Sequence, residues 1–482
     1  MKLFWGTLSL AALLCVSGCS NQRNPQPGDG TGTYVEGMYD SIPGDSVAPK
    51  DSIAAPKDSV VADSSPKIIE KIPFSRDSIL IQSRGGSPNG CKLLIPPIKV
   101  KGIYITGAMA GTKNMKNLVE LVETTEMNAI VLDIKNDGGN VTYKMDNAQA
   151  QSIGACVRYV KDMPALIKEL HEKGIYVIGR IVCFKDPILA RKRPDLALCQ
   201  PDSTPVTDGK GNPWVNPFKK GVWEYICDLA EQATRDGFDE IQFDYVRFPI
   251  GSSANRAVYG VDLNTYSKEQ GLTDFFSYVE KRLHKSNIIF GADLFGTVIG
   301  SPTDRKSTGQ DYVKIASMTD NICPMVYPSH YASRTFGLEV PDAHPYTTIL
   351  KAMQLSQDEL SKDSLPKARV RAWLQCFSAP WVPGHINYGS AQVKQQIQAV
   401  YDAGYDEWIL WNASNKYGQV KAALSMTKAP AESVAKKDTA SVKKVSDTTV
   451  ASKPSGDSTK KSEASKVETP VAPSDSAKQS ND

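Results

Sequence analysis

The chain has 482 residues, of which 41% are hydrophobic, 23% charged and 8% aromatic, and 56 Lys and Arg residues against 53 Asp and Glu leave a net charge of +3. This composition is ordinary for a globular protein and excludes a collagen, a coiled-coil rod, a small disulfide-stapled protein and a multi-span membrane protein. The balanced charge offers no basic field, so no nucleic-acid partner is expected.

The first nineteen residues have the pattern of a bacterial signal peptide, since Lys2 precedes an apolar run over 3–16 that is too short to span a bilayer. The run ends in Val-Ser-Gly-Cys, which resembles the lipobox of bacterial lipoproteins. That resemblance implies that Cys19 carries acyl chains such as palmitate and anchors the protein to the cell envelope membrane. Because no aspartate follows Cys19, the outer membrane is expected, on its periplasmic or surface face. An ordinary secreted protein is the alternative.

Two segments of low apolar content flank the central part of the chain. Residues 20–95 are rich in Pro, Ser and Asp and repeat Ala-Pro-Lys-Asp-Ser at 48–52 and 55–59, while residues 426–482 are rich in Lys and Ser. Neither segment can bury enough apolar surface to offset the entropy of folding, so a disordered tether and a disordered tail are predicted.

The nine cysteines show no spacing typical of a zinc site, and neither a metal nor another cofactor is expected. Cys183, Cys323 and Cys376 fall in apolar, strand-like segments and are predicted to be buried free thiols. One disulfide in an oxidising compartment is compatible with the remaining candidates, and the sequence does not choose among Cys91, Cys156 and Cys199.

Between residues 96 and 425, short apolar runs alternate with segments of helical periodicity. The runs predict strands over 102–106, 129–134, 175–182, 240–244, 288–294, 321–327, 369–377 and 407–411. Near-continuous apolar strands are typical of a parallel sheet buried on both faces. Eight strand–helix repeats over about 310 residues predict an α/β protein with a single (β/α)8 TIM barrel, expected to be a monomer. The absence of Gly-x-Gly-x-x-Gly after the first strand disfavours a dinucleotide-binding sheet.

Polar and aromatic residues gather at the predicted C-terminal strand ends, where such barrels carry their catalytic groups. Carboxyls can flank a glycosidic oxygen, cations and amides can fix hydroxyl groups, and aromatic rings can stack on sugars. This combination predicts a glycoside hydrolase whose substrate is a polysaccharide or glycan. The candidate residues are Asp133, Lys135, Arg180, Trp214, Asp244, Tyr245, Arg247, Asp293, Tyr327, Trp373, Gln375, Trp411 and Asn412.

Several of these candidates have more than one interpretation. Asp244 ends an apolar strand and is expected to point into the barrel mouth, with Asp293 as its catalytic partner. Asp133 has either a catalytic role or a structural and positioning one. Arg247 either holds Asp244 ionised or forms an ordinary loop ion pair. The two strand-end tryptophans are either sugar platforms or barrel packing.

A long motif around the fourth strand resembles a bacterial family of glycoside hydrolase domains long catalogued as a domain of unknown function. Residues 237–249 read Gly-Phe-Asp-Glu-Ile-Gln-Phe-Asp-Tyr-Val-Arg-Phe-Pro, and residues 213–218 read Pro-Trp-Val-Asn-Pro-Phe. The resemblance covers about residues 98–420. It implies a (β/α)8 barrel in which Asp244 is the nucleophile and Asp293 supplies the acid.

Neighbouring families differ from this sequence in informative ways. Chitinase-like barrels end their fourth strand in a catalytic Glu, which Phe243-Asp244-Tyr245-Val246 lacks, so substrate-assisted chemistry is not expected. The clan with glutamates on strands four and seven is disfavoured because strand seven offers Gln375. We therefore expect a retaining Asp/Asp pair. A catalytically inactive, lectin-like glycan-binding barrel or an envelope scaffold is the alternative, and five scattered histidines disfavour a metal-dependent deacetylase.

Overall fold

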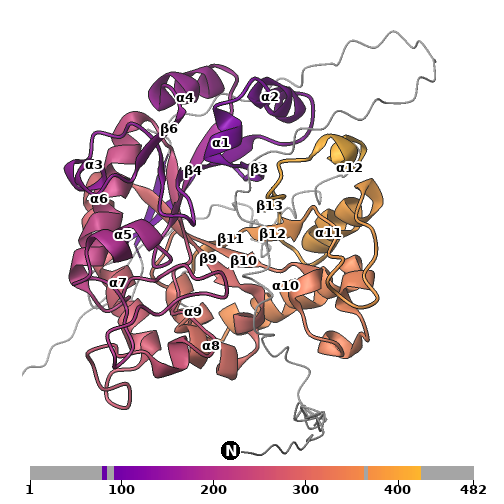
Figure 1. Cartoon of the computed structure of the whole chain (residues 1–482). Coiled ribbons are helices and arrows are strands. Elements are labelled where there is room, and N and C mark those ends of the chain that lie inside the picture. The colour runs from indigo at the N-terminus through magenta and orange to yellow at the C-terminus, as the bar shows by residue number, and fades with distance from the viewer. Residues whose placement is uncertain (1–78, 84–91, 363–366, 425–482) are drawn as a thin grey trace, which may run out of the picture. The chain divides into compact units, whose positions relative to one another are not determined.

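The structure is a computed structural model of the chain, and it describes residues 79–83, 92–362 and 367–424 (Figure 1). The predicted signal peptide with Cys19, the predicted tether up to residue 78 and the predicted tail over 426–482 lie outside the described residues. No helix within these ranges is long and apolar enough to cross a membrane.

Eight parallel strands form a closed barrel, which confirms the predicted (β/α)8 fold. Closure is visible in the register, because β3 pairs with β4 through Gly102 and Ala129 and with β13 through Lys101 and Trp408. A break at Arg371 divides the seventh strand into two pieces. In order, the strands are β3 (Lys101–Ile105), β4 (Ala129–Lys135), β7 (Tyr176–Val182), β8 (Glu240–Asp244), β9 (Ile289–Phe295), β10 (Asn321–Met325), β11 (Arg369–Val370) with β12 (Ala372–Gln375), and β13 (Trp408–Trp411).

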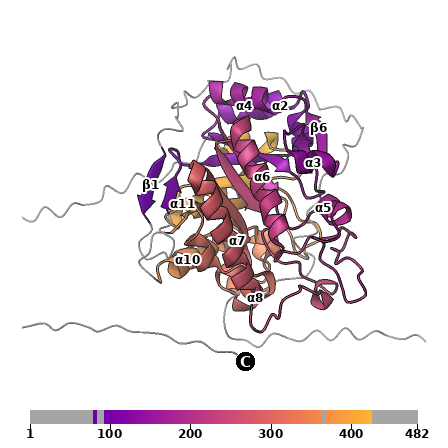
Figure 2. The same ribbon diagram turned by 90° about the vertical axis from the view of Figure 1, so that its left-hand side faces the viewer.

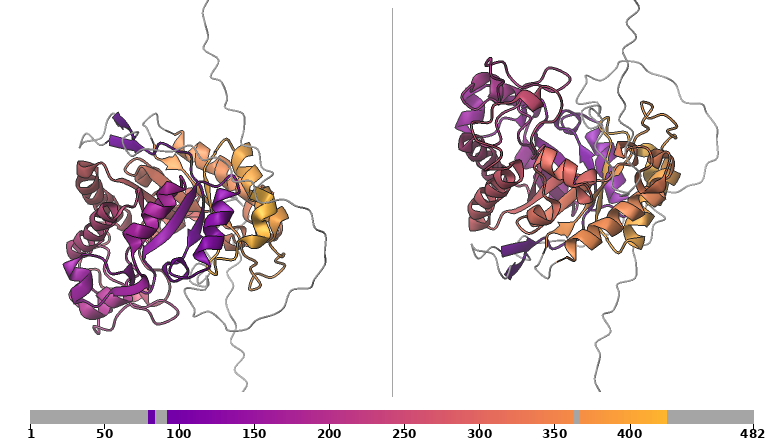
Figure 3. Two further views of the ribbon diagram at one scale, coloured as in Figure 1. Left: turned by 90° about the horizontal axis from the view of Figure 1, so that it is seen from above. Right: turned by 90° about the horizontal axis from the view of Figure 1, so that it is seen from below.

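Helices cover the outside of the barrel (Figures 1 and 3). Among them α4, α6, α9 and α11 contact the barrel strands directly, and α6 and α7 lie side by side in Figure 2. The covering helices are α2 (Met115–Glu123), α4 (Met163–Glu172), α6 (Lys220–Asp236), α7 (Lys268–Leu283), α9 (Tyr312–Ala316), α10 (Pro345–Leu360), α11 (Ser390–Asp402) and α12 (Lys421–Leu424). Shorter helices in the loops are α1 (Gly107–Ala110), α3 (Ala148–Ser152), α5 (Pro187–Lys192) and α8 (Pro302–Thr308).

An excursion between β4 and α4 was not predicted. β5 (Val141–Tyr143) pairs antiparallel with β4, and β6 (Cys156–Val160) extends the sheet parallel to β5. β5 has only three residues, and β6 exposes its middle positions, so neither produces the continuous apolar run that identified the barrel strands.

The end of the predicted tether is a correction to the sequence analysis. Leu80–Ser83 (β1) and Lys92–Ile95 (β2) pair as antiparallel strands, shown in indigo in Figure 2, although the composition predicted disorder up to residue 95. β2 is attached to the barrel, since the backbone N–H of Leu94 donates to Asp320 Oδ1 at 2.8 Å. Burial of the Leu93 and Leu94 side chains supplies the apolar contact that the surrounding polar sequence conceals.

The described cysteines are all free. Cys183, Cys323 and Cys376 are buried, which confirms the prediction for these three. Cys156 and Cys199 are not joined by a disulfide, and Cys91 lies outside the described residues.

Candidate active site

Two carboxyls lie next to each other at the C-terminal end of the barrel. Asp244 ends β8, and Asp293 lies in β9. Because Phe243 pairs with Ala292, the next residue on each strand is again a neighbour, which brings Asp244 beside Asp293. Both residues are buried, with 6% of Asp244 and 1% of Asp293 exposed. The two residues that the sequence analysis paired therefore lie on adjacent strands, and Asp244 is the slightly more exposed of the two.

Both oxygens of Asp244 accept hydrogen bonds. Arg180 donates to Oδ2 from Nε at 2.8 Å and from Nη2 at 2.6 Å, and the backbone N–H of Tyr245 donates to Oδ1 at 2.6 Å. Tyr245 has φ of 47°, a left-handed conformation that a tyrosine rarely adopts and that turns its N–H back onto the preceding side chain. Acting only as an acceptor is the role of an ionised carboxylate.

Asp293 has the opposite environment. Its Oδ1 accepts from Trp373 Nε1 at 2.6 Å and from Gln242 Nε2 at 2.5 Å, while Oδ2 has no hydrogen-bond partner among the described residues. Burial, followed by the negative charge of Asp244, raises the pKa of Asp293 well above its ordinary value. The two donors occupy Oδ1, so Oδ2 is the oxygen at which a proton would be held.

Asp133 fixes the arginine that holds Asp244. Asp133 Oδ1 accepts from Arg180 Nη1 at 2.7 Å, and its Oδ2 accepts from the Tyr104 hydroxyl at 2.7 Å. Burial raises the pKa of Asp133, which is fully enclosed on β4 next to Arg180 on β7. Since both oxygens of Asp133 are engaged away from Asp293, the structure favours the positioning role among the two left open by the sequence.

The aromatic rings at the mouth pack on one another. Tyr104 stacks on Trp411 with ring centroids 4.2 Å apart and planes 14° apart, and Trp373 meets Trp411 edge to face at 5.4 Å. Trp373 is 1% exposed and Trp411 9%. These contacts favour the packing interpretation of the two tryptophans over the sugar-platform one. Trp373 still takes part in the site through its N–H to Asp293.

The arginine that pairs with Asp244 is Arg180, and not Arg247 of the strand-four motif. Arg180 forms the ion pair with Asp244. The Arg247 guanidinium lies among three rings instead, 4.9 Å from the ring centroid of Trp214, 5.4 Å from that of Tyr245 and 4.6 Å from that of Phe295. It is therefore part of the wall beside Tyr245.

The remaining predicted residues have structural partners. Each is buried and bonded to a loop or strand, which accounts for its polarity without a substrate. Lys135 binds Asp186 at 2.7 Å, Gln375 donates to Asp342 at 2.9 Å, Asn412 donates to the carbonyl of Cys376 at 2.5 Å, and Tyr327 packs on His330 with ring centroids 5.1 Å apart. None of these contacts involves the carboxyl pair.

His330 gives the structure an expected pH dependence. Burial lowers the pKa of His330 to about 3, so the folded protein keeps this imidazole neutral while the unfolded chain protonates it near its ordinary value. Stability is therefore lost as the pH falls below that ordinary value, by about 2 kcal/mol at pH 5. Denaturant unfolding at pH 7 and pH 5 measures the loss. The variant His330→Gln should lose about 2 kcal/mol less over that interval, and equal losses in both proteins would contradict the assignment.

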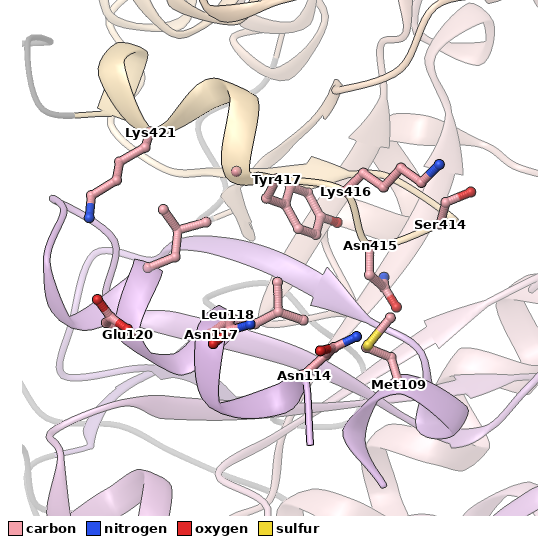
Figure 4. Close-up of a pocket in the computed structure, with 12 residues that line it drawn as sticks. Met109, Asn114, Asn117, Leu118, Glu120, Ser414, Asn415, Lys416, Tyr417 and Lys421 are labelled. Carbon is pink, nitrogen blue, oxygen red and sulfur yellow. The ribbon is translucent and has the colours of Figure 1, made fainter. Parts of the chain in front are cut away.

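A cavity of about 600 Å³ lies between α2 and the segment after β13 (Figure 4). Asn114, Glu120 and Lys416 are among its lining residues, and neither Asp244 nor Asp293 lines it. Its wall also supports the site, because Tyr417, another lining residue, donates its hydroxyl hydrogen to the carbonyl of Tyr104 at 2.8 Å.

Two carboxyls at the C-terminal strand ends of a (β/α)8 barrel lie where such barrels carry their active sites, and a carboxyl pair is what glycoside hydrolases use. No group of three or more His, Cys, Asp or Glu side chains in the described part of the chain could hold a metal ion. Residues 102–417 match a family described as "Putative glycosyl hydrolase domain", and the chain belongs to this family. Its class of activity is the hydrolysis of O-glycosyl bonds.

The chain is similar to several solved structures. A hypothetical protein from Ruminiclostridium thermocellum is 34% identical over 40% of this chain and 97% of its own, with a TM-score of 0.37. The PgaB (BpsB) glycoside hydrolase domain from Bordetella bronchiseptica is 12% identical over 69% of this chain and 100% of its own, with a TM-score of 0.51. The alpha-galactosidase TtGalA from Thermus thermophilus is 12% identical over 69% of this chain and 63% of its own, with a TM-score of 0.42. No curated protein sequence matches the chain.

Proposed function

We propose that the barrel hydrolyses glycosidic bonds of a polysaccharide or envelope glycan with retention of anomeric configuration, using Asp244 as nucleophile and Asp293 as general acid/base. One observation carries this proposal. Asp293 is buried with one oxygen that has no partner among the described residues, beside Asp244, whose two oxygens accept hydrogen bonds from Arg180 and Tyr245. A general acid and a nucleophile in one site need different environments of this kind.

In the first step an oxygen of Asp244 attacks the anomeric carbon while Asp293 Oδ2 gives its proton to the departing glycosidic oxygen. The products are a glycosyl ester on Asp244 and the released alcohol end of the glycan. In the second step the Asp293 carboxylate takes a proton from water, and the water oxygen attacks the anomeric carbon and frees Asp244. Retention is supported by the neighbouring positions of the two residues on β8 and β9, because retaining enzymes hold their carboxyls close together, about 5–5.5 Å apart, and inverting enzymes leave room for a water at about 6.5–9.5 Å.

Arg180 has a positioning role in this proposal. Its two N–H groups on Oδ2 fix the carboxylate plane, and Asp133 with Tyr104 fixes the guanidinium in turn. We propose Tyr245, which is partly exposed at the mouth, as a contact for the sugar at the cleavage site, with Arg247 behind it.

The proposal is tested by incubating the full chain with a panel of peptidoglycan, starch, xylan, galactomannan, dextran and pectin. Release of reducing ends by the wild type, absent with Asp244→Asn, is the expected result, and proton NMR of the first product should show the anomer of the substrate. Equal release by both proteins would reject Asp244 as nucleophile. Binding without release from any glycan would favour the inactive glycan-binding barrel instead.

The cellular location is proposed on sequence alone. Acylation of Cys19 would hold the enzyme on the envelope membrane, with outer membrane placement following from the absence of aspartate after the cysteine. An envelope or extracellular polysaccharide would then be the accessible substrate.

A further inference from the structure

Among the tryptophans of the described residues, one is exposed to solvent, on the loop that follows β12. Trp381 is 38% exposed, whereas Trp373, Trp411 and Trp214 are all buried. The loop leaves the C-terminal end of its strand, the end at which Asp244 and Asp293 lie. Trp381 therefore belongs to a loop at the same end of the barrel as the proposed active site.

The indole of Trp381 is only partly covered, and the side chain that covers it is another aromatic ring. Trp381 stacks on Phe377 with ring centroids 6.1 Å apart and planes 20° apart. Phe377 in turn meets Tyr327 edge to face at 5.9 Å and His330 at 6.3 Å. This aromatic column connects the exposed ring to the interior of the mouth.

The loop that carries Trp381 is fixed in place. Pro380 and Pro383 restrict the backbone on the two sides of Trp381. The Val382 N–H donates to the Ala379 carbonyl at 3.0 Å. These backbone restraints, together with the contact between the Trp381 and Phe377 rings, favour the exposed position of the indole.

Buried Asp342 holds the far end of the same loop. Its Oδ2 accepts from the N–H of Ile386 at 3.2 Å, its Oδ1 accepts from Gln375 at 2.9 Å, and its carbonyl accepts from the Tyr388 hydroxyl at 2.9 Å. The Gln375 side chain, first considered as a substrate ligand, therefore supports the loop that presents Trp381.

Other exposed apolar side chains do not offer the same surface. Val258, Val261 and Leu263 are aliphatic, and Tyr159 lies on β6 outside the ring of barrel strands. A flat indole face can stack on the C–H face of a pyranose ring, while branched aliphatic groups cannot. Stacking on a preorganised ring also costs little conformational entropy.

We propose that Trp381 forms an outer sugar-binding subsite, which stacks on a pyranose ring of the polysaccharide remote from the bond being cleaved. This inference rests on the proposed function for the identity of the ligand class. The subsite selects long chains, because a short glycoside held only at the carboxyl pair does not reach this loop.

The subsite is tested in the Asp244→Asn background by affinity electrophoresis of the full chain in gels that contain the soluble polysaccharides of the panel above. Adding Trp381→Ala should weaken retardation at least about fivefold, whereas Trp381→Phe, which keeps an aromatic ring, should stay within about threefold of its parent. Leu263→Ala, with a side chain of similar exposure on another loop, is the matched control and should not change retardation.

The outcomes separate this inference from the proposed function. Equal retardation of the Trp381→Ala variant and its parent, or no retardation of the parent by any polysaccharide, overturns the subsite. Weakened retardation together with no hydrolysis by the wild type supports the subsite and rejects the enzyme. Where the wild type does hydrolyse a polymer, the subsite requires a rise in KM for that polymer in Trp381→Ala with a smaller change in kcat.

Discussion

Replacing Asp244 with glycine is expected to lower the rate of glycan hydrolysis by roughly four orders of magnitude, because it removes the group that forms the covalent intermediate. The fold should tolerate the change. Asp244 ends its strand, and the cavity left by the carboxylate faces the mouth. The rate is measured as release of reducing ends from the polysaccharide that the wild type cleaves. Loss of activity alone would not identify a nucleophile. The decisive measurement is the product that forms when a small anion restores activity to the variant.

Azide is small enough to enter the space left by the Asp244 side chain, and it should restore part of the activity of Asp244→Gly. Azide then attacks the substrate directly, so the configuration inverts once and the glycosyl azide has the anomer opposite to the substrate. In Asp293→Gly, azide would attack the glycosyl ester on Asp244, and two inversions would give the original anomer. NMR of the two azides distinguishes these roles. The same anomer from both variants would contradict the assignment.

The strands of the barrel were readable in the sequence because they are buried on both faces. Asp244 ends β8, and Asp293 interrupts the apolar C-terminal half of β9, so both were polar residues near the strand ends at which a barrel carries its site. Because these strand ends meet at one mouth, the two carboxyls were expected to share it. This part of the site follows from periodicity alone.

The partners of the carboxyls did not follow from periodicity. Arg180 lies in the middle of an apolar strand and Tyr104 in another, and nothing in the spacing says that an arginine on β7 reaches carboxylates on both β4 and β8. The sequence also does not indicate which aromatic rings are exposed in the folded protein. Trp373 and Trp411 are buried because each covers the other, whereas Trp381 is exposed because its loop is fixed by contacts distant in the chain.

Replacing Arg371 with methionine is expected to lower the free energy of unfolding by about 3–5 kcal/mol, the cost of leaving a buried charge unpaired. Arg371 is fully buried at the end of the barrel opposite the carboxyl pair, where it donates to Glu240 at 2.7 Å and to Glu407 at 3.1 Å. Glu407 also forms an ion pair with Arg369, so Glu240 is the group that loses its cation. Denaturant unfolding of wild type and variant measures the difference.

The pH dependence of this loss identifies its cause. Burial raises the pKa of Glu240 even in the wild type, and removal of the Arg371 charge should raise that pKa further. A carboxyl with a raised folded pKa loses stability as the pH rises, because the unfolded chain ionises first, so the deficit of Arg371→Met should be larger at pH 8 than at pH 5. The double variant Glu240→Gln with Arg371→Met removes the unpaired charge and should recover part of the stability at pH 8. If both variants are equally unstable at both pH values, lost packing of the arginine side chain rather than the unpaired carboxylate explains the effect.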